Sequence, residues 1–345
     1  MKSTVKAMGF NKNKPRLWLT WNPNCRRSHV LAEQFGFELM EFALNSNPVT
    51  RQILGTLWTI RILFLHRPSH VIVQHSLLLS LTAAAFKRCR LGVKMLIIDA
   101  HTHSLLREMD SFLQPLYKAV KAFALRSADL VLVTNRALQT YVEEQRGRGY
   151  ILPDKIPNFP TSPREEKRLS GTFTVVFICS YSPDEPLREV LKAARRLSGD
   201  YRIYITGKLK KNRLNGLAVP DNVILTDFLS EPDYIKLLSS SDAIVVLTNT
   251  DNCMVCGAYE AVALGKPLIL SNKKVLRDYF FQGVIFTENT PQHLAESIMR
   301  AIAEKTSLEA DIKDLKAVLE QSWAEQSEAL YEKLHGKEAF KKVPS

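Results

Sequence analysis

The sequence has few cysteines, few glycines and prolines, and few acidic side chains in its first half. Its five cysteines stand at positions 25, 89, 179, 253 and 256. An odd number without framework spacing indicates reduced thiols, and this excludes a secreted disulfide scaffold. Glycine and proline number only 14 and 16 among 345 residues, which excludes collagen-like and low-complexity chains.

The sequence also lacks an apolar run long enough to cross a bilayer. Arg61 interrupts the apolar stretch 53–65, and Gln74 and His75 interrupt the stretch 71–86. Both fall short of the roughly 18–20 residues that a spanning helix needs. The basic amino terminus has no apolar run of the kind found in secretory signals. We therefore expect a cytoplasmic protein, with peripheral attachment to the inner face of the cell membrane left open.

The scarcity of acidic residues makes the first half strongly basic. Residues 1–160 carry 22 basic and 10 acidic side chains, whereas residues 161–345 carry 25 of each. A field of this sign attracts lipid headgroups, pyrophosphates or nucleic acid. The stretches 51–67 and 112–126 combine cations with aromatic and aliphatic side chains, as in a helix lying on an anionic membrane. A core-packed helix with a solvated basic face fits each stretch as well. The sequence has no helix-turn-helix, RNP or zinc pattern, so we expect no nucleic-acid partner.

Short β-rich runs alternate with helical patterns in both halves of the chain. This alternation predicts an α/β fold with two Rossmann-like, doubly wound domains that face a cleft. We expect a first domain over 1–157, a proline-rich linker over 158–171 and a second domain over 172–310. The segment 311–345 is expected to form a C-terminal helix and tail, which either stays on the second domain or crosses back. Strands are predicted at 16–20, 69–74, 94–99, 129–134, 173–179, 201–206, 223–226, 243–247, 267–271 and 284–286.

The stretch 245–271 is the most informative motif. A strand leads into a polar loop and then into a helix that begins near Gly257 and ends at the Gly265-Lys266-Pro267 stop. The amino end of a helix after a strand is suited to phosphate, and glycine lets backbone approach a ligand closely. Glu260, about one turn into this helix, is placed to accept hydrogen bonds from ribose hydroxyls.

This block resembles the GT-B glycosyltransferases, in particular the bacterial family-4-like enzymes. The residues that match are Glu260-Ala261, Ala263 and Gly265-Lys266-Pro267-Leu268-Ile269, and weaker similarity runs over about 16–305. The resemblance implies that the first domain handles the acceptor and that the second binds a nucleotide sugar. It implies no metal and no cofactor besides the nucleotide-sugar co-substrate, which agrees with the absence of an Asp-x-Asp motif from the sequence.

The resemblance also implies roles for single residues. Glu260 corresponds to the glutamate that binds the ribose, and Gly257 and Tyr259 are assigned to the same donor site. Asn252 stands where the family has its first glutamate, so Asn252 or the adjacent Asp251 is the expected contact to the donor sugar. Relatives often place an Arg and a Lys in the loop at 180–186, but here it reads SYSPDEP. Arg188 and Lys208 are therefore the cations expected at the diphosphate.

Two polar residues follow a strand end in the first domain and are the candidates for catalysis. His101 is expected to hydrogen-bond the donor sugar or to assist the acceptor hydroxyl. Asp99 is either catalytic or a simple cap of the next turn. The sequence His101-Thr-His103 supplies two histidines and no third ligand nearby, so no metal site is predicted.

These observations predict a glycosyltransferase of hexosyltransferase type. The basic first domain indicates a lipid-linked or polysaccharide acceptor, such as a polyprenyl-diphosphate-linked sugar. Two alternatives stay open: a catalytically inert GT-B homologue that acts as a binding partner, because two family groups are missing, and a sugar-nucleotide epimerase of the same fold.

Overall fold

The computed structural model describes residues 14–107, 112–159, 173–209, 214 and 216–335. The chain divides into two compact units, residues 1–152 and 153–345. Most of the expected linker, from residue 160 onward, lies outside the described residues, as do the basic amino terminus up to residue 13 and the tail from residue 336. In the described part, none of the helices is long and apolar enough to cross a membrane.

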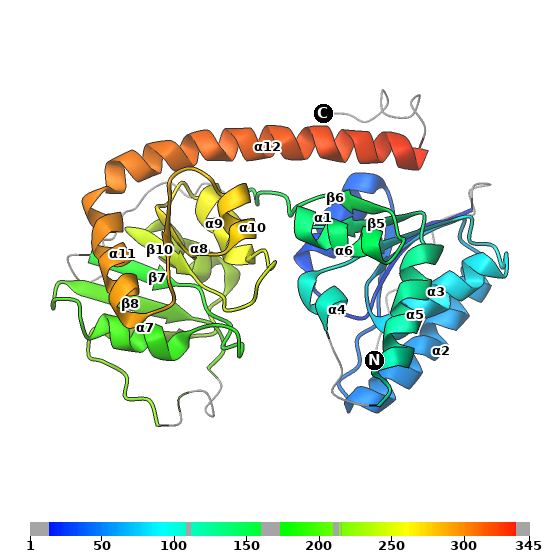
Figure 1. The fold of residues 1–345 in the computed structure, drawn as a ribbon, viewed down its shortest axis with the longest axis horizontal. Helices are drawn as coiled ribbons and strands as arrows, with labels where there is room; N and C mark the ends of the chain where they lie inside the picture. Colours follow the sequence, from blue (N-terminus) through cyan, green and yellow to red (C-terminus); the bar gives the residue numbers. More distant parts are fainter. Residues whose placement is uncertain (1–13, 108–111, 160–172, 210–213, 215, 336–345) are drawn as a thin grey trace. The chain divides into compact units, whose positions relative to one another are not determined.

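The first unit is built on a six-stranded sheet, whose strands pair in parallel (Figure 1). The sheet order is β2-β1-β3-β4-β5-β6. The strands are β1 (Arg16–Thr20), β2 (Glu38–Glu41), β3 (His70–Gln74), β4 (Met95–Asp99), β5 (Leu130–Val133) and β6 (Gly149–Ile151). The helices are α1 (Arg26–Phe35), α2 (Pro48–His66), α3 (Leu77–Arg88), α4 (Thr102–Leu106), α5 (Gln114–Ser127) and α6 (Arg136–Glu144).

The central strands of this sheet are apolar on both faces because helices cover both. Leu17, Val71 and Ile98 belong to one core cluster, to which α2, α3, α5 and α6 also contribute. Trp18, Ile72 and Ile97 alternate with them, so their side chains point to the opposite face. All six are at most 1% exposed. This two-sided burial explains why the strands read as continuous apolar runs in the sequence.

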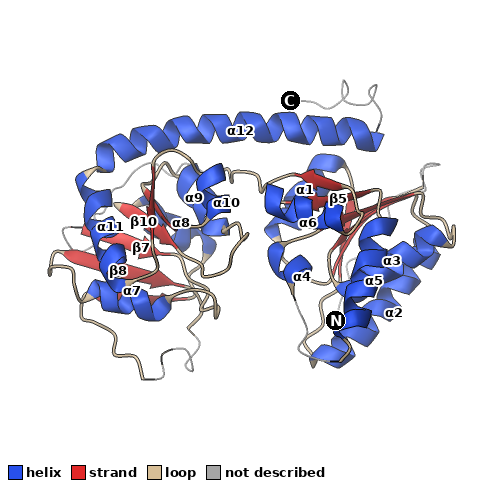
Figure 2. Ribbon diagram, in the orientation of Figure 1, coloured by secondary structure: helices blue, strands red, loops and turns tan. Residues whose placement is uncertain are grey.

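The second unit repeats the plan of a sheet flanked by helices (Figure 2). Its strands lie in the order β12-β11-β10-β7-β8-β9. Its strands are β7 (Phe173–Phe177), β8 (Tyr201–Thr206), β9 (Val223–Asp227), β10 (Ala243–Val246), β11 (Leu268–Ser271) and β12 (Val284–Thr287). Its helices are α7 (Leu187–Ala194), α8 (Glu231–Ser239), α9 (Cys256–Ala263), α10 (Lys274–Tyr279), α11 (Pro291–Ala303) and α12 (Lys305–His335). The two parallel six-stranded sheets confirm the predicted α/β fold class.

Each sheet has one point where the strand order reverses. In the first unit the chain leaves β1 toward β2 and then returns to β3 on the other side of β1. In the second unit β8 and β9 lie on one side of β7, and β10 to β12 lie on the other. Ligands of open α/β sheets bind outside the carboxyl ends of the strands at such a point. The segments after β1 and β3, and after β7 and β10, are therefore where functional side chains should be sought.

A glycine at the end of β8 shows how tightly the second of these edges is built. Gly207 has φ of +97°, and a Cβ atom placed on it would lie 2.0 Å from the carbonyl oxygen of Cys179. Any side chain here would collide with the backbone that follows β7. Glycine is therefore required at this position because two loops pack closely at the carboxyl edge of the sheet.

Candidate active site

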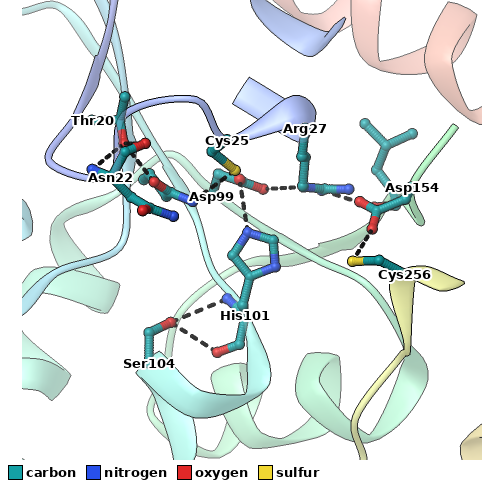
Figure 3. Close-up of polar contacts among 11 residues, drawn as sticks. Thr20, Asn22, Cys25, Arg27, Asp99, His101, Ser104, Asp154 and Cys256 are labelled. Carbon is teal, nitrogen blue, oxygen red and sulfur yellow. Dashed lines mark hydrogen bonds and ion pairs between the residues drawn. The ribbon is translucent and has the colours of Figure 1, made fainter. Parts of the chain in front are cut away.

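The end of β4, where the sequence predicts catalytic residues, carries a buried ion pair. Asp99, the last residue of β4, is fully buried, and its Oδ1 atom accepts a hydrogen bond from Nε of Arg27 at 2.9 Å (Figure 3). Arg27 comes from the first turn of α1, and its Nη2 atom donates to the carbonyl oxygen of Leu152 at 2.9 Å. The pair thus joins β4, α1 and the segment that follows β6.

His101 lies on the other side of the Asp99 carboxylate. Its Nε2 atom is 3.4 Å from Oδ2 of Asp99, and its side chain is 35% exposed. The backbone N–H of His101 donates to Oγ of Ser104, whose hydroxyl donates back to the carbonyl oxygen of His101. His101 is thus the N-cap of α4, and Asp99 does not cap this turn. Asp99 contacts the imidazole on its buried side, while part of the ring is exposed to solvent.

The charge state of Asp99 follows from its neighbours. Burial alone would raise the pKa of this carboxyl, but the Arg27 guanidinium and His101 together lower it to about 2. Asp99 is therefore ionised throughout the physiological range, and a carboxylate with this pKa is a poor general base. The geometry favours a positioning role for Asp99 and leaves the exposed part of His101 as the group that can reach a substrate.

A cavity of about 300 Å³ opens beside these residues, at the switch point of the first sheet. Its lining holds one arginine and three histidines among ten residues: Trp21, Asn22, Arg51, Gln52, Gln74, His75, Ser76, His101, His103 and Ser104. Oγ1 of Thr20 donates to Oε1 of Gln74, and the Gln74 amide donates to Sγ of Cys25 at 3.2 Å, so the ends of β1 and β3 are tied together. No lining residue is a carboxylic acid, which suits a hydroxyl-rich or anionic ligand.

One of the lining histidines is almost fully buried. Nδ1 of His75 lies 2.8 Å from Oγ of Ser80, and its backbone N–H donates to the carbonyl oxygen of Asp99. Burial, with a contribution from electrostatic interactions with Lys121 and His101, lowers the pKa of His75 to about 4. His75 is therefore a neutral hydrogen-bonding group at neutral pH.

In the second unit, Glu260 lies on α9 as predicted. It is partly buried, and its Oε2 atom accepts a hydrogen bond from the hydroxyl of Tyr234 on α8 at 2.6 Å. The contact orients the carboxylate about one turn into α9. Gly257 in the first turn of this helix is buried, and a Cβ there would lie 2.9 Å from Cδ1 of Ile178 and 3.1 Å from Cγ2 of Val246. Its absent side chain lets α9 pack closely on the sheet.

Three other residues assigned to the donor site have different environments. Tyr259 is 2% exposed, and its ring packs against Tyr279 and Phe280. The position of Tyr259 on α9 directs its side chain into the core of the unit, so its placement does not favour donor binding. Asp251 is exposed and forms an ion pair with Lys273 at 2.8 Å. Asn252 is half-buried and adopts a left-handed backbone with φ of +58°. Their contact to a donor sugar stays a prediction.

The cations expected at the diphosphate are both exposed. Arg188 lies in the first turn of α7, and Lys208 follows Gly207 at the end of β8. Across the described residues, no group of three or more His, Cys, Asp or Glu side chains is arranged to hold a metal ion.

Sequence reasoning assigned no role to Arg27 or Tyr234, because their partners are 72 and 26 residues away. The only available signals were a cation after the first strand and a tyrosine in the helix before Glu260.

Two family models match this chain. Residues 22–152 match the glycosyl transferase 4-like domain, and residues 158–316 match glycosyl transferases group 1. Comparison with curated proteins gives no significant match. The class defined by the fold and these matches is the two-domain GT-B transferase.

Solved structures share the fold at low sequence identity. HepE of Anabaena, solved with UDP, is 15% identical with a TM-score of 0.70 over 93% of this chain and 99% of that chain. A glycosyltransferase of Rickettsia africae is 10% identical with a TM-score of 0.66, covering 94% and 100%. A UDP-N-acetylglucosamine 2-epimerase from Listeria monocytogenes, so described provisionally, is 11% identical with a TM-score of 0.57, covering 86% and 82%. The chain belongs to the family-4-like GT-B glycosyltransferases.

The Arg27–Asp99 pair generates a first prediction. We expect Arg27→Met to lower the free energy of unfolding by about 3–5 kcal/mol, because it leaves the buried Asp99 charge without its partner. Arg26→Met is the matched control: Arg26 is the exposed neighbour, and we expect a change within about 0.5 kcal/mol. Urea unfolding followed by tryptophan fluorescence measures both. Equal stability of the two variants would contradict the buried pairing.

His75 generates a prediction on pH. Its pKa is about 4 in the folded chain against 6.5 in the unfolded chain, so the unfolded chain binds the proton first as pH falls. Stability is lost between pH 6.5 and 4, and by pH 4.5 the loss from this residue is about 2 kcal/mol. In His75→Gln the difference in unfolding free energy between pH 7 and pH 4.5 should shrink by that amount. An unchanged difference would show that His75 is not buried in its neutral form.

Proposed function

We propose that this chain transfers a hexose from a uridine-nucleotide sugar to an acceptor hydroxyl without a metal ion. The observation that carries the proposal is Glu260, which Tyr234 holds about one turn into α9, the helix that follows β10 at the switch point of the second sheet. A carboxylate at this position can accept hydrogen bonds from ribose hydroxyls, and the N–H groups at the amino end of the helix can bind phosphate. The solved relative HepE, bound to UDP and UDP-glucose, supports the choice of uridine.

The first unit supplies the acceptor side of the proposal. Its 300 Å³ cavity holds Arg51 and three histidines, and its lining has no carboxylate. His101, oriented by the ionised Asp99, is the group we propose to hydrogen-bond the reacting sugar or the acceptor hydroxyl. The leaving diphosphate would be stabilised by helix dipoles and by Arg188 and Lys208 rather than by a divalent ion.

We further propose that the acceptor is lipid-linked, as in polysaccharide assembly, and that the first unit rests on the inner leaflet of the membrane. On α2 the side chains of Val49, Ile53, Leu57 and Leu65 are all more than half exposed along one face, with Arg61 among them. Phe112 and Leu116 are exposed at the start of α5, next to Lys118. Apolar side chains mixed with cations are complementary to anionic headgroups.

One observation favours the alternative of a catalytically inert homologue. The loop 180–186 carries Asp184 and Glu185 and no cation, so it does not provide a positive grip on phosphate. Such a homologue would bind a partner or a nucleotide and would transfer no sugar.

Calorimetric titration with a panel of nucleoside diphosphates tests the donor site. We expect saturable binding of UDP, weakened about tenfold or more by Glu260→Gln because the charged acceptor for the ribose is lost. Glu296→Gln removes an exposed carboxylate from α11 and serves as the matched control. If no nucleotide binds at millimolar concentration, or if both variants bind alike, the donor assignment is wrong.

Vesicle sedimentation tests the membrane surface. The wild-type chain should bind phosphatidylglycerol vesicles more tightly than phosphatidylcholine vesicles, and added salt should weaken the binding. Replacing Ile53, Leu57 and Leu65 by serine should weaken it about tenfold or more, since exposed side chains can be changed without opening the core. Serine at Phe228, an exposed residue of the second unit, is the control. Equal binding by all variants would contradict the proposed surface.

A further inference from the structure

The loop after β7 has an internal carboxylate bound to its backbone amides. The N–H of Ser180 lies 3.1 and 2.9 Å from the two carboxylate oxygens of Glu185, and the N–H of Ser182 donates to Oε2 at 2.8 Å. The hydroxyl of Ser180 adds contacts at 3.1 and 3.2 Å. Tyr181, between the two serines, has φ of +58°, which turns the flanking amides toward one anion. Convergent amides of this kind form an anion-binding nest.

This nest lies at the switch point of the second sheet. The loops after β7 and β10 meet there, and Asp184 joins them: Oγ1 of Thr248 donates to its Oδ2 atom at 2.9 Å, and the N–H of Asn249 donates to its carbonyl oxygen at 2.7 Å. The crevice at such a point is where an open α/β sheet binds its ligand. Glu185 is therefore bound at the edge of the sheet where the donor diphosphate is expected.

The charge balance of these loops is the reverse of what a diphosphate needs. Residues 178–188 and 247–257 contain the carboxylates of Asp184, Glu185 and Asp251, and their only cation is Arg188. A diphosphate that entered this edge would meet Glu185 in the nest. The diphosphate must either displace that carboxylate from the amides of Ser180 and Ser182 or bind beside a like charge.

We propose that Glu185 competes with the donor phosphate for this nest and thereby limits the affinity for nucleoside diphosphates. The inference rests on the proposed donor site and adds a residue that sets its strength. Glu185 lies in the loop before α7, whereas the ribose contact of the proposed donor site, Glu260, lies on α9, so we expect Glu185 to have no part in recognition of the base or ribose. A weakly held diphosphate also leaves readily, and product release limits the turnover of many enzymes.

Titrations of UDP and uridine into wild-type protein, Glu185→Gln and Glu189→Gln test this inference. Glu189 lies in the first turn of α7 and is the matched control, since its substitution removes the same charge four residues further along the chain. We expect Glu185→Gln to bind UDP about fivefold or more tightly than wild type, while uridine affinity stays within about twofold. Glu189→Gln should match the wild type for both.

Three results would overturn the inference. UDP affinity that is unchanged or reduced in a folded Glu185→Gln variant means that the carboxylate only supports the loop. If this variant does not fold, NMR of the wild-type protein replaces the titration. The amide signals of Ser180 and Ser182 should shift when UDP is added and should not shift with uridine. Signals that do not shift with UDP overturn the inference. A wild-type chain that binds neither compound overturns the proposed function itself, which distinguishes that failure from a failure of the Glu185 inference alone.

Discussion

A charge buried away from water must be paired, and the contact between Arg27 and Asp99 meets this need in the first unit. The two side chains are 4% and 0% exposed and are joined at 2.9 Å. Their pairing keeps Asp99 ionised, with a pKa of about 2, and the carboxylate in turn orients His101. The second hydrogen bond of Arg27, to Leu152, extends the network to the end of the unit. Removing one partner of such a pair costs several kcal/mol, so the same contact both holds the fold and prepares the candidate site.

The second unit uses backbone amides where the first uses a buried ion pair. Its carboxyl edge is closed by Gly207, whose missing side chain lets the end of β8 lie against the loop after β7. That loop turns its amides inward, and they are satisfied by Glu185. Glu260 and Tyr234 lie on neighbouring helices and form a separate polar contact. In the proposed donor site, the contacts to the nucleoside and to its phosphates therefore come from different elements of the unit, which can be altered independently.

The central strands, the parallel α/β class, the positions of Asp99 and His101 at a strand end and the position of Glu260 on a helix were predictable from the sequence. Buried strands show as continuous apolar runs, and a strand end is marked by the first polar residue. The short strands β2 and β6 were missed because Glu38–Glu41 is only partly buried and Gly149–Ile151 has three residues. The partners of Asp99 and Glu260 were beyond reach because they come from distant segments. The inward phase of Tyr259 depends on how α9 packs, which no local pattern encodes.

The proposed function requires that the protein transfer a sugar. The measurement is release of UDP from a panel of UDP-sugars, with a lipid extract as the source of acceptor and no divalent ion, by wild-type protein and His101→Ala. We expect acceptor-dependent UDP release by the wild type and a loss of about a hundredfold or more in the variant, the usual scale for a group acting on the reacting centre. Equal rates for the two proteins would contradict the role of His101. Binding of UDP without release from any UDP-sugar would identify the chain as an inert member of its family.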